Sequence, residues 1–385
     1  MLTPPGGCQA RFDGSTYFEG CLLKCSSLWT GKSLNRRRFL GWSLSTILGA
    51  TLTSCTQDTK SIQKKQLNIY SWADYLHPDT IPEFERRFGI HVVYDTFASN
   101  ESLLAKLQAG ATAYDIIVPT SYMIKQLRKL NKLSVLDHHR LTNLKNIMPR
   151  FVDPKFDPHL EHSIPYTWGT TGIAFNSAAV AKADWPTNTD IFWNAKYAHR
   201  MTLLDDARET IGMSLKKRGH SFNSIDEPMI SAAVADLVVQ KPLTMCYTSD
   251  QVIVQLASAD SWLSLVYSGD AYQAQRENKD VKYVIPENGT SIWLDSLCIP
   301  NGAPHVENAY KWINFMLEPE VAAATASYTR YATPNELAFK LLPADVSQDR
   351  NLYPPPDVMA QCEELADIGS GIFIYDQMWT ELKCS

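Results

Sequence analysis

The sequence predicts an α/β protein whose central sheet is mainly parallel, and three observations support this. Strand-like apolar runs alternate with helix-like segments from residue 67 onward. Residues 114–118 are apolar almost throughout, as expected for a strand buried on both faces of a parallel sheet. The chain has 385 residues, 45% of them hydrophobic, which is enough for two domains.

The alternation can be followed along the chain from the periodicity of apolar residues and from the glycines and prolines that interrupt it. We predict strands at residues 67–70, 90–97, 114–118, 163–176, 200–204, 262–267 and 291–300. We predict helices at residues 78–88, 100–109, 205–219, 226–240, 305–317 and 319–328. Two further helices open at residues 119–122 and 268–272, and two more follow residue 354. The long strand at 163–176 contains Gly169 and Gly172, whose backbone freedom suggests a hinge between two lobes.

The loop after the first strand contains two aromatic residues that flank a carboxylate, namely Trp72, Asp74 and Tyr75. In a parallel sheet, ligands bind at the carboxyl ends of the strands. Aromatic faces and an acid suit an organic cation, which they hold by cation–π contact and a charge-assisted hydrogen bond. The alternative is that these aromatic residues only fill the core.

Later strand ends have the same character. Five carboxylates and six aromatic side chains lie at these junctions: Trp72, Asp74, Tyr75, Tyr122, Asp206, Glu209, Tyr267, Asp270, Trp293, Asp295 and Tyr331. Carboxylates on several loops can clamp ammonium groups that are spread along a chain, and aromatic walls can cover the methylenes between them. The pattern therefore predicts a site for an elongated organic cation.

Some of these acids also have structural explanations. Asp206 and Glu209 fit a helix capping box, and Asp270 fits an acid that the helix dipole favours. Trp293 and Asp295 lie two apart on one strand and so share a face. A structural role explains this pair poorly, because a buried unpaired carboxylate is costly.

Other function classes receive little support. The sequence contains no H-E-x-x-H, G-x-S-x-G or P-loop motif. His159 and His162 lie in a proline-rich loop. Contact with solvent is a simpler interpretation of these two histidines than a metal site. Asp206 and Glu209 could in principle support glycoside hydrolysis. The net charge of -5 and the lack of a basic run argue against nucleic acid. We predict no catalytic residue, metal or cofactor.

The first 55 residues differ from the rest and predict an export signal preceded by an N-terminal extension. Arg36 and Arg37 precede an apolar run that is short for a membrane span. The twin arginines resemble a twin-arginine signal, and residues 52–55 resemble a lipobox in which Cys55 is lipidated. The alternative is an ordinary cleaved signal. Residues 56–66 are polar and fit a tether.

Four cysteines follow the signal: Cys246, Cys298, Cys362 and Cys384. Export permits disulfides, but the pairing cannot be deduced from the spacing. Cys298 lies in an apolar strand and is interpreted as a buried free thiol.

Seven segments occur in an order and spacing that resemble the periplasmic spermidine/putrescine-binding proteins of bacterial polyamine ABC transporters. They are SWADYL, FASNESLLAKL, YDIIVPTSY, SIPYTWGTTGIAFN, LLDDARE, SIWLDSLCIP and YATPN. The resemblance implies a type II periplasmic-binding-protein fold, in which two α/β lobes joined by crossover strands close on a linear polyamine without catalysis. We place one lobe at residues 67–171 plus 296–344 and the other at 172–295 plus 345–385.

The same resemblance implies which residues line the cleft: Trp72, Asp74, Tyr75, Thr120, Tyr122, Asp206, Glu209, Trp293, Asp295 and Tyr331. Three positions vary. Tyr267 replaces a tryptophan wall, and Leu365 stands near a glutamine of spermidine-preferring members. Asp270 resembles an acid of putrescine-preferring members.

The sequence thus predicts a periplasmic, lipid-anchored, monomeric polyamine receptor that docks on the membrane permease of an ABC importer. A binding protein for thiamine or ferric iron is the alternative within the same class, although iron prefers a cluster of Tyr, His and carboxylate ligands. A secreted hydrolase is the alternative from another class.

Overall fold

The structure is a computed structural model that describes residues 65–110 and 113–385. Its strands form one sheet in the order β2-β1-β3-β9-β4-β7-β5-β6, with β8 paired to β4 and β10 paired to β9. The strands are β1 Gln66–Ser71, β2 His91–Thr96, β3 Ile116–Ile117, β4 Ser163–Asn176, β5 Met201–Leu203, β6 Thr244–Tyr247, β7 Leu263–Tyr267, β8 Val281–Val284, β9 Ser291–Cys298 and β10 Glu363–Glu364.

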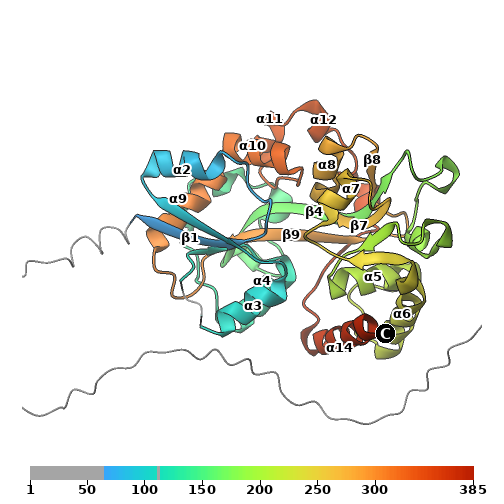
Figure 1. Cartoon of the computed structure of the whole chain (residues 1–385). Coiled ribbons are helices and arrows are strands. Elements are labelled where there is room, and N and C mark those ends of the chain that lie inside the picture. Colours follow the sequence, from blue (N-terminus) through green and yellow to red (C-terminus); the bar gives the residue numbers. More distant parts are fainter. Residues whose placement is uncertain (1–64, 111–112) are drawn as a thin grey trace, which may run out of the picture. The chain divides into compact units, whose positions relative to one another are not determined.

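Helices cover this sheet on both faces (Figure 1). They are α2 Thr80–Phe88, α3 Asn100–Gln108, α4 Ser121–Lys129, α5 Ala207–Lys217, α6 Glu227–Gln240, α7 Val252–Ala257, α8 Ser268–Glu277, α9 Val306–Met316, α10 Pro319–Thr329, α11 Glu336–Leu341, α12 Ala344–Ser347, α13 Pro356–Met359 and α14 Ile372–Cys384. In the described residues, no helix combines the length and the apolar composition that a membrane crossing requires.

The sheet is parallel in two separate groups and antiparallel where these groups meet. β1 pairs in parallel with β2 and β3, and β5 pairs in parallel with β6 and β7. The long strands β4 and β9 run antiparallel to each other and pass through the middle of Figure 1. The prediction of a mainly parallel sheet is therefore correct for the two outer groups and wrong for the centre.

Local sequence signals set the element boundaries. Helix α2 ends at Gly89, whose φ of 63° is left-handed, and α3 begins after Ser99, whose hydroxyl accepts a hydrogen bond from Ser102 N. The predicted strand at 163–176 matches β4 at both ends. The predictions missed β6, β8, β10, α7, α11 and α12, all of which are short.

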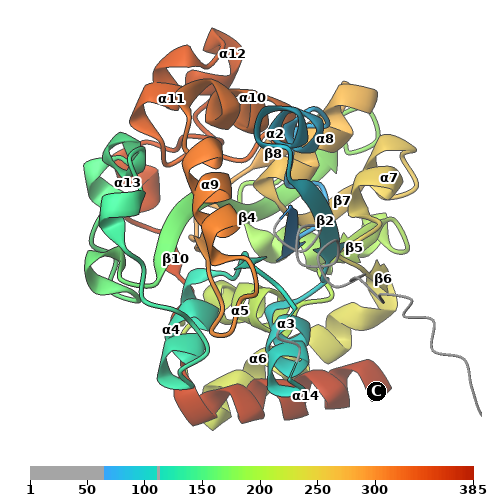
Figure 2. The same cartoon turned by 90° about the vertical axis from the view of Figure 1, so that its left-hand side faces the viewer.

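The apolar core is divided into several clusters around different strands. Ile69, Phe84 and Trp312 belong to a cluster around β1, α2 and α9. Leu203 and Tyr375 belong to another around β5, α5, α6 and α14. Figure 2 shows α14 beside α6 at the lower edge of the fold. The division into two lobes at the predicted boundaries stays a prediction.

The two glycines of β4 allow close packing. A Cβ atom at Gly169 would lie 2.6 Å from the Trp293 ring, and one at Gly172 would lie 2.5 Å from the Tyr283 hydroxyl. Side chains of neighbouring strands occupy this space, which explains both glycines without reference to motion. The hinge at these positions stays a prediction. Arg36, Arg37 and Cys55 of the predicted export signal lie outside the described residues.

Candidate functional site

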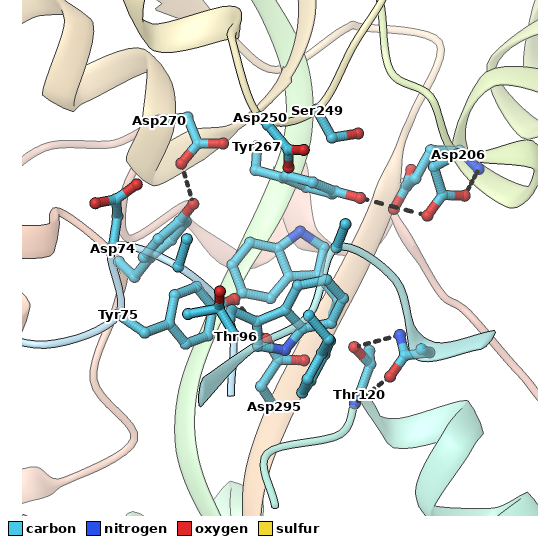
Figure 3. A pocket seen from close by; sticks show the side chains of 18 of the residues that line it. Asp74, Tyr75, Thr96, Thr120, Asp206, Ser249, Asp250, Tyr267, Asp270 and Asp295 are labelled. Carbon is cyan, nitrogen blue, oxygen red and sulfur yellow. Dashed lines mark hydrogen bonds between the residues drawn. The ribbon is translucent and has the colours of Figure 1, made fainter. Parts of the chain in front are cut away.

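A cavity of about 340 Å³ lies between the two parallel groups of the sheet (Figure 3). The loops after β1, β2, β3, β5, β6 and β7 contribute to its wall, together with β9. All twelve residues predicted for the site line it: Trp72, Asp74, Tyr75, Thr120, Tyr122, Asp206, Glu209, Tyr267, Asp270, Trp293, Asp295 and Tyr331. The structure brings them together, and their contact with a ligand stays a prediction.

The charge of this cavity is strongly one-sided. Six carboxylates line it: Asp74, Asp206, Glu209, Asp250, Asp270 and Asp295. Among its lining residues there is no lysine, arginine or histidine side chain. Seven aromatic residues share the wall: Trp72, Tyr75, Phe97, Tyr122, Tyr267, Trp293 and Tyr331. Such a cavity favours a cation with apolar surface.

Asp295 and Glu209 are the two most buried acids of the cavity wall. Strand β9 places Asp295 with Trp293 on one face, as the spacing predicts, and only 2% of the surface of Asp295 is exposed. One carboxylate oxygen accepts a hydrogen bond of 2.5 Å from the Tyr75 hydroxyl, and the other has no partner. Burial raises the pKa of Asp295 to about 7. A cation in the cavity would supply the missing partner.

Asp270 lies in the first turn of α8 and accepts a 2.5 Å hydrogen bond from the Tyr331 hydroxyl. Burial raises its pKa to about 7, and the negative charges of Asp74 and Asp250 add to this effect. The dipole of α8 favours an acid at this position of the helix. Asp270 also contacts Tyr331 and lines the cavity, so the dipole is not its only interaction.

Asp206 and Glu209 fulfil only half of the capping-box pattern. Asp206 caps α5 by accepting a hydrogen bond from Glu209 N at 3.0 Å. The Glu209 side chain does not return to the cap; it accepts a hydrogen bond from Ser291 Oγ at 2.6 Å. Burial, followed by the charge of Asp206, raises the pKa of Glu209 to about 8. The two acids thus sit together at the cavity with few cationic partners.

The aromatic side chains form a continuous series along the wall. Tyr75 lies 5.1 Å from Tyr331 between ring centroids, Tyr331 lies 5.3 Å from Trp293, and Trp293 lies 5.8 Å from Tyr267. All three pairs are tilted or edge-to-face, which are favourable geometries. The Tyr267 hydroxyl lies 3.4 Å from Asp206, so this smaller aromatic residue adds a polar contact.

Thr120 and Tyr122 line the cavity and also make hydrogen bonds within its wall. Thr120 Oγ1 accepts from Asn100 at 3.0 Å, and the Tyr122 hydroxyl donates to Glu101 at 3.1 Å. The Thr120 hydroxyl, like that of Tyr75, opposes the rise of the Asp295 pKa. Tyr122 also borders a second cavity of about 320 Å³ beside α3 and α14. Both residues therefore contribute surface to the site, and their hydrogen bonds hold its loops.

Sequence reasoning missed nine other lining residues: Ala73, Thr96, Phe97, Ala98, Asn100, Ser249, Asp250, Ile253 and Leu365. The sequence marks Leu365 only as a departure from the family pattern. Ser249 and Asp250 follow β6, a strand that the sequence pattern does not predict. Their position at the carboxyl end of a strand is the signal that identifies them once β6 is known.

Metal and disulfide sites are not found in the part of the chain that the structure describes. No group of three or more His, Cys, Asp or Glu side chains there could hold a metal ion. His162 lies 3.3 Å from Asp157, and exposed His159 lies near Asp153. Among the described residues, Cys246, Cys298, Cys362 and Cys384 are free, and Cys298 is buried as predicted.

Comparison with known proteins gives a consistent result. Residues 79–354 match the family model described as bacterial extracellular solute-binding protein. A spermidine/putrescine-binding periplasmic protein of Salmonella typhimurium is 34% identical over 343 residues, which is 89% of this chain and 98% of that protein.

Solved structures agree with this. A putative spermidine/putrescine ABC transporter structure from Listeria monocytogenes has a TM-score of 0.79 and 36% identity, with 83% of this chain and 99% of that chain covered. A lipoprotein of Treponema pallidum has a TM-score of 0.72 and 27% identity, with 82% and 99% covered. The chain therefore belongs to the bacterial extracellular solute-binding proteins, and within them to the spermidine/putrescine-binding periplasmic group.

Proposed function

We propose that this protein captures polyamines outside the cytoplasm and delivers them to an ABC importer. The observation that carries the proposal is the cavity with six carboxylates, seven aromatic residues and no basic side chain. Carboxylates neutralise the ammonium groups, and the aromatic faces cover the methylenes between them. The names of the relatives support the same ligand class.

The energetic demand is modest. A micromolar site needs about -8 kcal/mol. Two or three charge-assisted contacts contribute ~1.5–3 kcal/mol each, and apolar burial adds to them. Asp295, Asp270 and Asp206 lie at separate points of the wall, so a linear ligand with several amines matches the site better than a compact cation does.

Delivery requires capture, closure around the ligand and docking of the closed form on a permease. The lining loops come from both ends of the sheet order, so a ligand that contacts all of them would hold the two sides together. A monomer anchored outside the inner membrane through Cys55 fits this role and remains part of the proposal.

Catalysis has no part in this proposal. Each buried acid of the wall already accepts a hydrogen bond from a hydroxyl, namely Tyr75 to Asp295, Tyr331 to Asp270 and Ser291 to Glu209. These contacts suit fixed recognition of charge. A ligand that is returned unchanged after binding would distinguish a receptor from a hydrolase.

Calorimetry tests the proposal directly. The protein is titrated with putrescine, spermidine and spermine, and with thiamine as a cation of another shape. We expect micromolar or tighter binding of at least one polyamine, and mass spectrometry should recover it intact. Binding of thiamine alone would favour the alternative cation, and no binding of any polyamine would reject the proposal.

A further inference from the structure

Asp250 is an unpredicted acid of the cavity wall, and it has no partner of its own. It lies in the loop between β6 and α7 and is exposed. Within the described residues, its carboxylate makes no hydrogen bond and no ion pair. Capping of α7 does not account for it, because the residue before α7 is Gln251 and makes no side-chain cap.

Asp74 is a second unpartnered acid at the same cavity. It follows β1, is exposed and has a left-handed backbone with φ of 55°. Aspartate is one of the few residue types other than glycine that adopt this conformation, at some cost. Its carboxylate also lacks a hydrogen bond or ion pair in the described part of the chain. Both acids thus lie at the cavity without a counter-charge.

The two acids come from distant parts of the sheet. Asp74 follows β1 and Asp250 follows β6, near opposite ends of the strand order. Figure 3 shows them along one edge of the cavity, with Asp270 in the same group. The charges of Asp74 and Asp250 both act on Asp270. Two carboxylates from loops and one from the first turn of α8 therefore face one region of the cavity, and no basic side chain lines that cavity.

We propose that Asp74 and Asp250 form a clamp that holds a terminal ammonium group of the ligand against Asp270. The inference rests on the proposed polyamine function and assigns Asp250 as a recognition residue. Without a cation the like charges repel each other, and with one they are bridged. Because the loops belong to opposite sides of the sheet, the bridged ammonium ties them together and slows the release of the ligand.

The clamp predicts a different kinetic effect from long-range electrostatic attraction of the ligand to the cavity. A charge at the rim that only steers a ligand changes the association rate and its salt dependence. A charge that contacts the bound ammonium changes the dissociation rate. The two roles are therefore separated by kinetics, and the tryptophans of the cavity wall provide a fluorescence signal for stopped-flow measurements.

The experiment compares the unmodified protein with Asp250→Asn, Asp250→Glu and Asp280→Asn, using putrescine at 150 mM salt. Asp280 is exposed and lies outside the cavity. Asp280→Asn therefore changes the net charge by the same amount as Asp250→Asn but leaves the cavity wall unchanged. We expect Asp250→Asn to dissociate at least fivefold faster with less than a twofold change in association. Asp250→Glu should stay within twofold of the parent, and Asp280→Asn should match it.

An unchanged dissociation rate in Asp250→Asn, or an equal effect in Asp280→Asn, overturns the clamp while polyamine binding remains. A change only in the association rate assigns steering to Asp250 and also overturns the clamp. If the unmodified protein does not bind any polyamine, the proposed function fails first and the clamp fails with it.

Discussion

The hydroxyl of Tyr75 donates a 2.5 Å hydrogen bond to the carboxylate of Asp295, a residue 220 positions away in sequence. This bond connects the loop after β1 with strand β9, which lies in the centre of the sheet. It satisfies one oxygen of a buried acid and leaves the other without a partner. The site therefore contains a carboxylate that is held in place by Tyr75, and its other oxygen is free to accept a hydrogen bond from a cation.

Asp295→Asn should weaken polyamine binding by at least ~30-fold, which corresponds to about 2 kcal/mol. The variant leaves an ammonium group in the cavity without its charged partner. The Tyr75 hydroxyl can still donate to the amide oxygen, and a buried charge is removed. We therefore expect the unfolding temperature of the empty protein to stay the same or rise.

Calorimetry and thermal unfolding measure the two effects, with Asp280→Asn as the control for net charge. Wild-type affinity in Asp295→Asn for all polyamines would show that the inner wall is assigned incorrectly.

The empty protein should lose stability as the pH rises from about 4 to about 8. The pKa values of Asp295 and Asp270 are raised to about 7 and that of Glu209 to about 8, whereas unfolded carboxyl groups titrate near ~4. In this window the folded protein binds more protons than the unfolded chain, so the free energy of unfolding falls with increasing pH. Urea unfolding of the parent should show a steeper fall than that of Asp295→Asn. Equal slopes would contradict the raised pKa of Asp295.

Polyamine binding should show the opposite dependence on pH. A cation favours the ionised acids, so binding below pH ~7 should release protons and become weaker as the pH falls. Calorimetry in buffers with different ionisation enthalpies measures the released protons. A binding enthalpy that does not depend on the buffer at pH 6 would exclude this linkage.

Gly169→Ala should destabilise the protein by about 1–3 kcal/mol, because the added methyl group overlaps the Trp293 ring. The displaced indole should also weaken binding. Trp293→Phe in the same chain should restore part of the stability, since the smaller ring leaves room. Denaturant unfolding of the two single variants and the double variant tests this, and additive losses in the double variant would argue against the contact.

Leu365→Gln should raise the affinity for spermidine relative to putrescine. Leu365 is buried at the cavity wall, near the position where spermidine-preferring relatives are expected to have a glutamine. One new hydrogen bond contributes ~0.5–1.5 kcal/mol, so the affinity ratio should change by about threefold to tenfold. Titrations with both polyamines give the ratio. A constant ratio in a variant of normal stability would show that this position does not select the ligand.

Cys55→Ala should release the exported protein from membranes, if the lipobox-like sequence carries a lipid anchor. Replacement of Arg36 and Arg37 by lysine should block export, because the twin arginines are the feature that the export pathway reads. Cell fractionation of a full-length fusion distinguishes the two effects. Continued membrane association of the Cys55 variant would exclude this anchor.

Much of the fold followed from the sequence because its long elements have strong signals. β4 has an apolar pattern over its full length, and α2 and α3 have clear ends at Gly89 and Gly110. The central antiparallel pairing of β4 and β9 was not predicted, because strand direction depends on contacts between segments more than 100 residues apart.

The site residues were likewise predictable where the local sequence signal was strong. Trp72 was found by its position after a predicted strand, and Asp295 by its place on the same strand face as Trp293. Asp250 was missed because β6 is only four residues long and its burial is partial. The partners of each acid were also beyond prediction, since Tyr75 and Tyr331 reach their carboxylates only after the chain has folded.

The contact between Gly169 and Trp293 has a consequence for related sequences. The Trp293 ring occupies the space that any side chain at position 169 would need. The two positions should therefore covary: relatives with a large aromatic residue at position 293 should keep glycine at position 169, and those with a side chain at 169 should have a smaller residue at 293. The shape of this part of the cavity wall should therefore change only when both residues, on neighbouring strands, change together.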